Sequence, residues 1–121
     1  MNSAKVKAAL DEAMSIEGAL GVRLVDYQSG MTLGTAGGHG MNLEMAAAGT
    51  TEVVRSKLRV MGALGLEDRI EDMLITLGSQ YHLIRMVRDT DSLFLYIALN
   101  KGPANLGLAK FQLSSVEQKL S

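Results

Sequence analysis

The glycine-rich stretch GTAGGHGMN, Gly34 to Asn42, is the part of the sequence that most resembles a phosphate-binding loop. A Walker loop needs a lysine followed by serine or threonine at the start of the next helix, but the first lysine after this stretch is Lys57. A dinucleotide-binding loop that uses Gly38 and Gly40 needs a third glycine where Leu43 stands. Both phosphate motifs are therefore absent.

The same glycines predict a reversal of the chain. Gly37, Gly38 and Gly40 can adopt positive φ without strain. This freedom suits a connection from a strand into a helix capped by Asn42. A connector is the simpler interpretation of the stretch. The alternative is that Gly37 to Gly40 form the rim of a ligand pocket, and the sequence alone leaves that alternative open.

No other residues have the spacing of a catalytic or metal-binding motif. The chain has two histidines, and a predicted helix and strand separate them. We expect His39 to be solvated in the glycine-rich stretch and His82 to pack within a strand, where it alternates with Ile84 and Met86. There is no cysteine, so thiolate metal sites and cysteine nucleophiles are excluded. The sequence predicts no catalytic residue, metal site or cofactor, and we expect a protein that is not an enzyme.

Composition and charge argue against two classes of partner. The 12 Lys and Arg residues against 13 Asp and Glu residues leave a formal net charge of -1, and the basic residues are scattered instead of forming a face for a phosphate backbone. No apolar run approaches the roughly 20 residues of a membrane span, and the N-terminal MNSAKVKAALDEAM has charges throughout, unlike a signal peptide. We expect no nucleic-acid partner, no membrane insertion and a cytoplasmic protein.

Hydrophobic periodicity predicts the elements of the first half of the chain. Apolar residues recur at helical spacing from Val6 to Met14 and predict a first helix. The runs ALGVRLVD and MTLGTA, separated by the turn residues YQSG, predict a hairpin of two strands. The longest helical pattern extends from Asn42 to about Ala63 and contains Gly49, which we interpret as a site where another backbone packs closely.

The second half predicts three strands and a helix. The runs RIEDMLITL, YHLIRMVRD and LFLYIALN, at 69–77, 81–89 and 93–100, are joined by connections short enough for antiparallel hairpins. The last run is apolar on both faces, so we expect a central strand with helices on both sides. Residues 101–120 predict a final helix with Pro103 in its first turn. The order is α-β-β-α-β-β-β-α, an α+β fold that we expect to form one domain over residues 1–121.

This order, with particular stretches of sequence, resembles the roadblock / dynein light chain superfamily, most closely its short bacterial, actinomycete-like members. The similarity lies in GALGVRLVDYQSGMTLGT at the first hairpin, in IEDMLITLGSQYHLIR at the third and fourth strands, and in LFLYIALN followed by ANLGLAKFQL at the last strand and helix. The match covers nearly the whole chain.

The resemblance implies a five-stranded antiparallel sheet with the second helix on one face and the first and last helices on the other. It also implies homodimers that pair their third strands and second helices. The residues support a dimer independently, because MLITL at 73–77 would be an apolar edge with little charge if the third strand is unpaired. For each expected interface residue, the alternative is a place in the core of one protomer. The expected interface residues are Val53, Val54, Leu58, Met61, Met73, Ile75 and Leu77.

The two sides of the long helix have different expected roles. Glu52, Arg55 and Arg59 lie on its polar side, and the two arginines share a face because they are four residues apart. We expect a partner to bind there. Met45 falls on the apolar pattern, where we expect it to fill the core.

The resemblance also implies a non-catalytic dimeric regulator or scaffold. Bacterial roadblock proteins are often encoded beside a small Ras-like GTPase and modulate its nucleotide cycle. Our leading hypothesis is therefore a homodimer that binds such a GTPase through the paired second helices. Two alternatives stay open, because fold alone does not give function. One is a small-molecule sensor with a pocket between helix and sheet, and the other is an architectural adaptor that joins two proteins without changing either.

Overall fold

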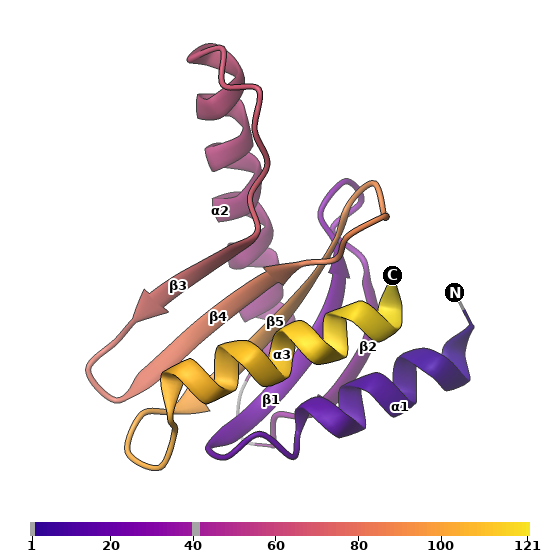
Figure 1. Ribbon diagram of the computed structural model, residues 1–121, viewed down its shortest axis with the longest axis vertical. Coiled ribbons are helices and arrows are strands. Elements are labelled where there is room, and N and C mark those ends of the chain that lie inside the picture. The colour runs from indigo at the N-terminus through magenta and orange to yellow at the C-terminus, as the bar shows by residue number, and fades with distance from the viewer. Residues whose placement is uncertain (1, 40–41) are drawn as a thin grey trace.

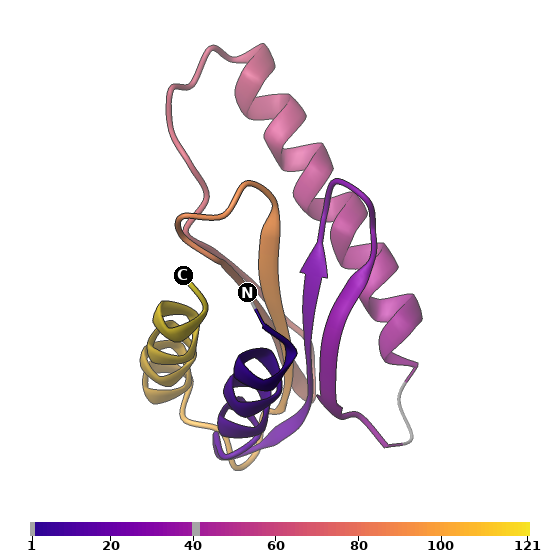
Figure 2. The ribbon, with the colours of Figure 1, turned by 90° about the vertical axis from the view of Figure 1, so that its right-hand side faces the viewer.

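The computed structural model describes residues 2–39 and 42–121, and its elements follow the predicted order. Helices α1 and α3 lie side by side on one face of the sheet, and α2 crosses the opposite face (Figures 1 and 2). The predicted α+β architecture is confirmed. The elements are α1 (Ser3–Ala13), β1 (Ala19–Asp26), β2 (Thr32–Gly37), α2 (Leu43–Ala63), β3 (Asp72–Thr76), β4 (Gln80–Met86), β5 (Leu93–Asn100) and α3 (Leu106–Leu120).

The sheet is antiparallel throughout, with the strand order β2-β1-β5-β4-β3. Strand β5 pairs with β1 on one side and with β4 on the other. Its residues 94–99 are all buried, because both faces of this strand are covered. The predicted central position of the last strand is therefore confirmed, and β2 and β3 form the two edges of the sheet.

The alternation of side chains along β5 separates two apolar cores. Leu95, Ile97 and Leu99 belong to the core beneath α1 and α3, whereas Phe94 and Tyr96 belong to the core beneath α2. The first core is the larger, because two helices contribute to it. One strand thus stabilises both layers of the fold.

Helix α1 packs so closely on β2 that there is no room for a side chain at Gly34. A Cβ atom at this position would lie 2.8 Å from Leu10 Cδ1 and 2.8 Å from Val6 Cγ1. We expect Gly34→Val to lower the free energy of unfolding by about 1–3 kcal/mol, because overpacking forces neighbouring side chains out of their rotamers.

Thermal unfolding followed by circular dichroism would measure this loss. The matched control is Gly78→Val, since an added Cβ at Gly78 meets nothing within 4 Å. Equal stability of the two variants would contradict close packing of α1 on β2.

Capping residues decide where the helices begin. The Asn42 side chain accepts a hydrogen bond of 3.0 Å from the Met45 N–H, as predicted for the start of α2. In α3 the cap is Asn105, which accepts from the Leu108 N–H at 3.0 Å. The predicted place of Pro103 in the first turn is therefore wrong, and this residue lies in the preceding turn.

The glycine-rich stretch acts as the predicted connector where the structure describes it. Gly37 and Gly38 have φ of 65° and 83°, in the left-handed region that glycine adopts without strain. The predicted positive φ of Gly40 lies outside the described residues.

Candidate protein-interaction surface

A groove between α2 and β3 is the candidate site, and we call it the α2–β3 groove. It has a volume of about 540 Å³ and is open to solvent. Val53 and Val60 on α2 are 40% and 46% exposed, and Ile75 on β3 is 37% exposed. Exposed apolar residues that gather in this way mark interaction surfaces more often than isolated ones. The groove is lined by Glu52, Val53, Ser56, Lys57, Arg59, Val60 and Met73.

The register of β3 brings its apolar residues to the face that α2 crosses. Met73 is paired with Ile84, which belongs to the core beneath α2, and Ile75 is paired with His82. Because side chains alternate along a strand, Met73 and Ile75 share this face, and Leu77 follows directly after the strand. Among the described residues, strand β3 pairs with β4 alone, so its other side presents unpaired backbone groups next to the groove.

The structure separates the predicted interface residues into three groups by their exposure. Val53, Ile75 and Leu77 are exposed, whereas Leu58 and Met73 are half-buried. Val54 is fully buried and Met61 nearly so, which corresponds to the alternative of a place in the core of one protomer. A partner can therefore contact the first group directly, but not Val54.

Gly49 is open on the outer side of α2. A Cβ atom built at this position meets nothing within 4 Å. No described element of the same protomer therefore packs against it, so the predicted close approach of another backbone requires a second chain.

Helical spacing suggested that Arg55 is free to bind a partner, but its side chain is hydrogen-bonded within the protomer. Its Nε donates to the Tyr27 carbonyl at 2.6 Å, and its Nη2 donates to the Gln28 carbonyl at 2.8 Å. Its Nη1 donates to Glu52 at 3.0 Å. Arg55 thus anchors α2 to the turn after β1, and its guanidinium is occupied within the protomer. Glu52 and Arg59 remain exposed beside the groove.

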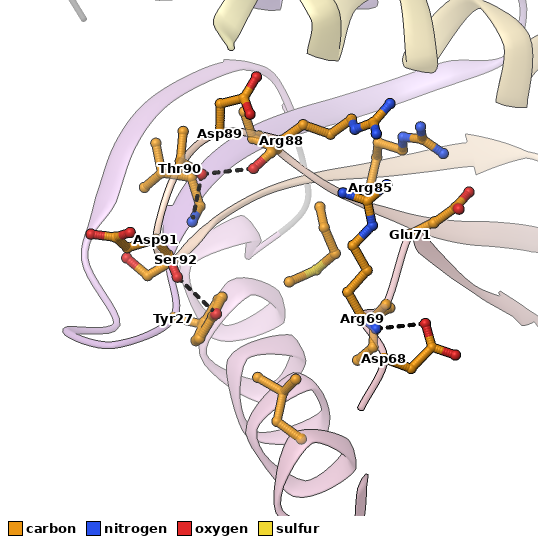
Figure 3. Close-up of a pocket in the computed structure, with 15 residues that line it drawn as sticks. Tyr27, Asp68, Arg69, Glu71, Arg85, Arg88, Asp89, Thr90, Asp91 and Ser92 are labelled. Atoms are coloured by element: carbon orange, nitrogen blue, oxygen red, sulfur yellow. Dashed lines mark hydrogen bonds between the residues drawn. The ribbon is translucent and has the colours of Figure 1, made fainter. Parts of the chain in front are cut away.

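A smaller pocket of about 230 Å³ lies where α2, the α2–β3 connection and the β4–β5 hairpin meet (Figure 3). Its lining includes three arginines, Arg69, Arg85 and Arg88, and the carboxylates of residues 68, 71, 89 and 91. The Tyr27 hydroxyl donates to the Asp91 carbonyl at 3.0 Å, and burial raises the pKa of this tyrosine, with a further contribution from nearby carboxylates. The pocket therefore presents both signs of charge.

The glycine-rich stretch does not form the rim of this pocket. Its described residues 37–39 are not part of the lining. The structure thus contains a cavity of the kind that a small-molecule sensor would need, but it lies at a different place from the one predicted. Sequence reasoning missed this cavity because its lining comes from four segments that are distant along the chain.

One wall of the pocket is held by a buried ion pair that the sequence did not indicate. Arg85 Nε donates to Glu117 Oε1 at 3.1 Å, and the Glu117 side chain has no exposed surface. The other carboxylate oxygen accepts from the Arg88 backbone N–H at 3.3 Å and from the Ser121 hydroxyl at 3.0 Å. Burial removes water from both carboxylate oxygens of Glu117, and these three donors replace it. The network therefore holds α3 against β4.

His82 lies beside Ile75 on the face that carries the α2–β3 groove. Its Nε2 is 2.8 Å from Gln80 Oε1 and its Nδ1 is 3.1 Å from the Tyr96 hydroxyl. Burial lowers the pKa of His82, because desolvation disfavours the imidazolium. The predicted packed position in a strand is confirmed, and His39 is exposed as expected.

Lowering the pH should therefore destabilise the fold through His82. His82 of the unfolded chain binds a proton near pH 6.5, but in the folded chain it does so only at lower pH. Neutral His82 therefore makes its full contribution to the free energy of unfolding above about pH 7, and this contribution declines as the pH falls. Urea unfolding between about pH 7.5 and 5.5 would measure the slope. We expect His82→Gln to flatten this dependence of the free energy of unfolding on pH. An equal slope in wild type and His82→Gln would contradict this assignment.

Within residues 2–39 and 42–121, no group of three or more His, Asp or Glu side chains is arranged to hold a metal ion. In the same part of the chain, no helix has the length and apolar composition needed to cross a bilayer.

Comparison with known proteins identifies the fold. No family model matches the chain, and no curated protein matches it in sequence. Solved structures do match: MglB of Myxococcus xanthus is 19% identical with a TM-score of 0.85, covering 97% of this chain and 85% of that one. The gliding protein MglB of Thermus thermophilus is 16% identical with a TM-score of 0.82, covering 99% and 90%.

A roadblock/LC7 domain from Streptomyces avermitilis is 9% identical with a TM-score of 0.80, covering 93% of this chain and 92% of that domain. The chain therefore has the roadblock/LC7 fold, which it shares with MglB. The resemblance inferred from the sequence is confirmed at the level of the fold, and the bacterial, actinomycete-like branch stays a prediction.

Proposed function

We propose that the chain is a non-catalytic homodimer that acts as a regulator or scaffold for a small Ras-like GTPase. The observation that carries this proposal is the α2–β3 groove, where exposed apolar side chains lie beside an unpaired strand edge. In a monomer, the backbone groups of the β3 edge and the apolar side chains of the groove would both be exposed to water. An exposed edge and an exposed apolar surface both favour association with another chain.

Pairing of two β3 edges would satisfy both features together. Two antiparallel β3 strands would join two five-stranded sheets into one of ten strands. The α2 helix of each protomer would then lie near its counterpart, and the open surroundings of Gly49 would let the backbones approach closely. Ile75 and Leu77 would be covered in the same step.

The GTPase is proposed from the fold and from the position of α2. The far half of α2 extends beyond the sheet (Figure 1), so paired helices would form a long projecting surface. Exposed Glu52 and Arg59 flank the groove and supply charges of both signs for specificity. Arg55 is not part of this surface, because its guanidinium is bound to the turn after β1.

Affinity capture from the source organism's lysate tests the partner. The tagged protein is incubated in parallel with excess GDP and with a non-hydrolysable GTP analogue, and the bound proteins are identified by mass spectrometry. We expect a Ras-like GTPase in one sample only, and weaker capture by Arg59→Glu than by the control Lys5→Glu on α1. Recovery of a different protein equally from both samples would favour an architectural adaptor instead.

A small-molecule sensor is the second candidate, because the pocket beside Tyr27 is lined by charged side chains of both signs. Native mass spectrometry of the purified protein would test it directly. A bound mass that disappears in Arg88→Glu would support a sensor, whereas a bare protein whose melting temperature no metabolite changes would count against it.

A further inference from the structure

The second edge of the sheet, formed by β2, is also unpaired among the described residues. The Gly38 N–H donates to the Leu20 carbonyl at 2.7 Å, and the register continues with Ala36 opposite Val22. Alternate residues of an antiparallel strand turn their N–H and C=O groups to opposite sides, so Thr35 directs both groups away from β1. Figure 2 faces this edge, and no helix crosses in front of it.

Charge does not protect this edge. Residues 27–43 contain no Asp, Glu, Lys or Arg, although about a fifth of the chain is charged. Exposed edges in soluble proteins usually carry lysine or proline that prevents pairing with other chains. Here the neighbouring exposed side chains are Met31 and Leu33, which are apolar. An exposed edge without such protection can accept an extended peptide as an added strand.

The position of α1 counts against a second copy of β2 as the occupant. Helix α1 lies directly on β2, since the space above Gly34 is filled by Leu10 and Val6. Paired strands are about 4.8 Å apart, whereas packed helices need about 8–10 Å. Antiparallel pairing of two β2 strands would therefore crowd the two α1 helices on one face of the joined sheet. An extended segment without a helix of its own avoids this crowding.

The opposite face offers room for the side chains of such a segment. A hollow of about 410 Å³ lies there, lined by Arg23, Met31, Thr32, Glu44 and Ala48 among others. The irregular register between Leu24 and Val25 limits the regular ladder to a few residues, so the segment must be short.

We propose that the β2 edge binds a short, extended, mainly apolar segment of a partner protein by strand addition. Thr35 supplies the central pair of backbone hydrogen bonds. This site lies at the opposite edge of the sheet from β3 and does not depend on the proposed dimer or GTPase.

Peptide display tests the proposal with the full chain. A phage library of random peptides of about ten residues is selected against the wild-type protein, and the enriched peptides are synthesised for fluorescence anisotropy. We expect alternating β-branched sequences whose affinity falls by about tenfold or more in Thr35→Pro, because proline removes the outward N–H and blocks the edge. Thr35→Val keeps that N–H and should bind normally. Peptides that bind at β3 would not respond to either change.

Thr35→Pro is informative only if the variant folds, so hydrogen exchange of the wild-type protein provides a second, independent test. Addition of an enriched peptide to the wild-type protein should slow exchange of the Thr35 amide. The proposal is overturned if no peptide is enriched, if enriched peptides bind Thr35→Pro and wild type equally, or if the Thr35 amide stays unprotected.

Discussion

Replacement of Glu117 by alanine is expected to lower the free energy of unfolding by about 3–5 kcal/mol. The carboxylate has no exposed surface, and the Arg85 side chain with which it pairs is only 17% exposed. Removing the carboxylate leaves a mostly buried guanidinium with Asp72, at 3.6 Å, as its remaining ion-pair partner. The same change removes an acceptor from the Arg88 N–H and from the Ser121 hydroxyl.

Urea unfolding at pH 7 would measure the loss, and two further variants separate charge from packing. Glu117→Gln keeps the shape of the side chain and should be intermediate. The double variant Glu117→Leu with Arg85→Met should recover much of the stability, because apolar replacement of both partners avoids an unpaired buried charge. If Glu117→Ala and the double variant were equally unstable, packing and not the ion pair would explain the loss.

Ile75→Lys is the second change with a large expected effect, and it acts on assembly. Antiparallel pairing of two β3 strands would place both introduced lysines in one apolar interface. We expect the dimer to dissociate about a hundredfold more readily or worse, since each dimer would bury two unpaired charges. Light scattering coupled to size exclusion, over a range of protein concentrations, would detect monomers where the wild type is dimeric.

Leu108→Lys is the matched control for this experiment. Leu108 is similarly exposed, but it lies on α3 at the other face of the sheet. We expect this variant to keep the wild-type assembly state. Circular dichroism should show that both variants are folded, because Ile75 is at an edge and its side chain is partly exposed. An Ile75→Lys protein that is folded and still dimeric would place the interface elsewhere.

The fold could be predicted from sequence because local patterns and global position agree. Residues 93–100 are apolar on both faces of a strand, so both faces must be covered by helices. This requirement predicted the central position of β5 in the sheet. Asn42 was identifiable as a cap because a short polar acceptor preceded a long periodic segment. Met73 and Ile75 share one face of β3, because strand alternation follows directly from spacing, whereas Leu77 lies just beyond the end of the strand.

The candidate surface was harder to predict because helical spacing does not show which neighbours a side chain meets. Met45 falls on the apolar pattern of α2 yet is 70% exposed, so the expectation that it fills the core was wrong. Arg55 lies on the polar side but bonds to a turn about 27 residues earlier in the chain. The sequence did not indicate the buried position of Glu117, because its ion-pair partner Arg85 lies on β4, with β5 and its connections between them along the chain.

We expect association through the projecting half of α2 to be partly a folding reaction. Beyond the sheet this half is supported mainly by its own turns and by the connection that returns to β3 (Figure 1). Helical segments of this length are marginally stable in water without tertiary packing. A partner that covers them must therefore also fix their backbone, and part of the binding free energy is spent on that ordering. The enthalpy of association should accordingly become more negative as temperature rises, with a heat-capacity change larger than a rigid interface of equal area would give.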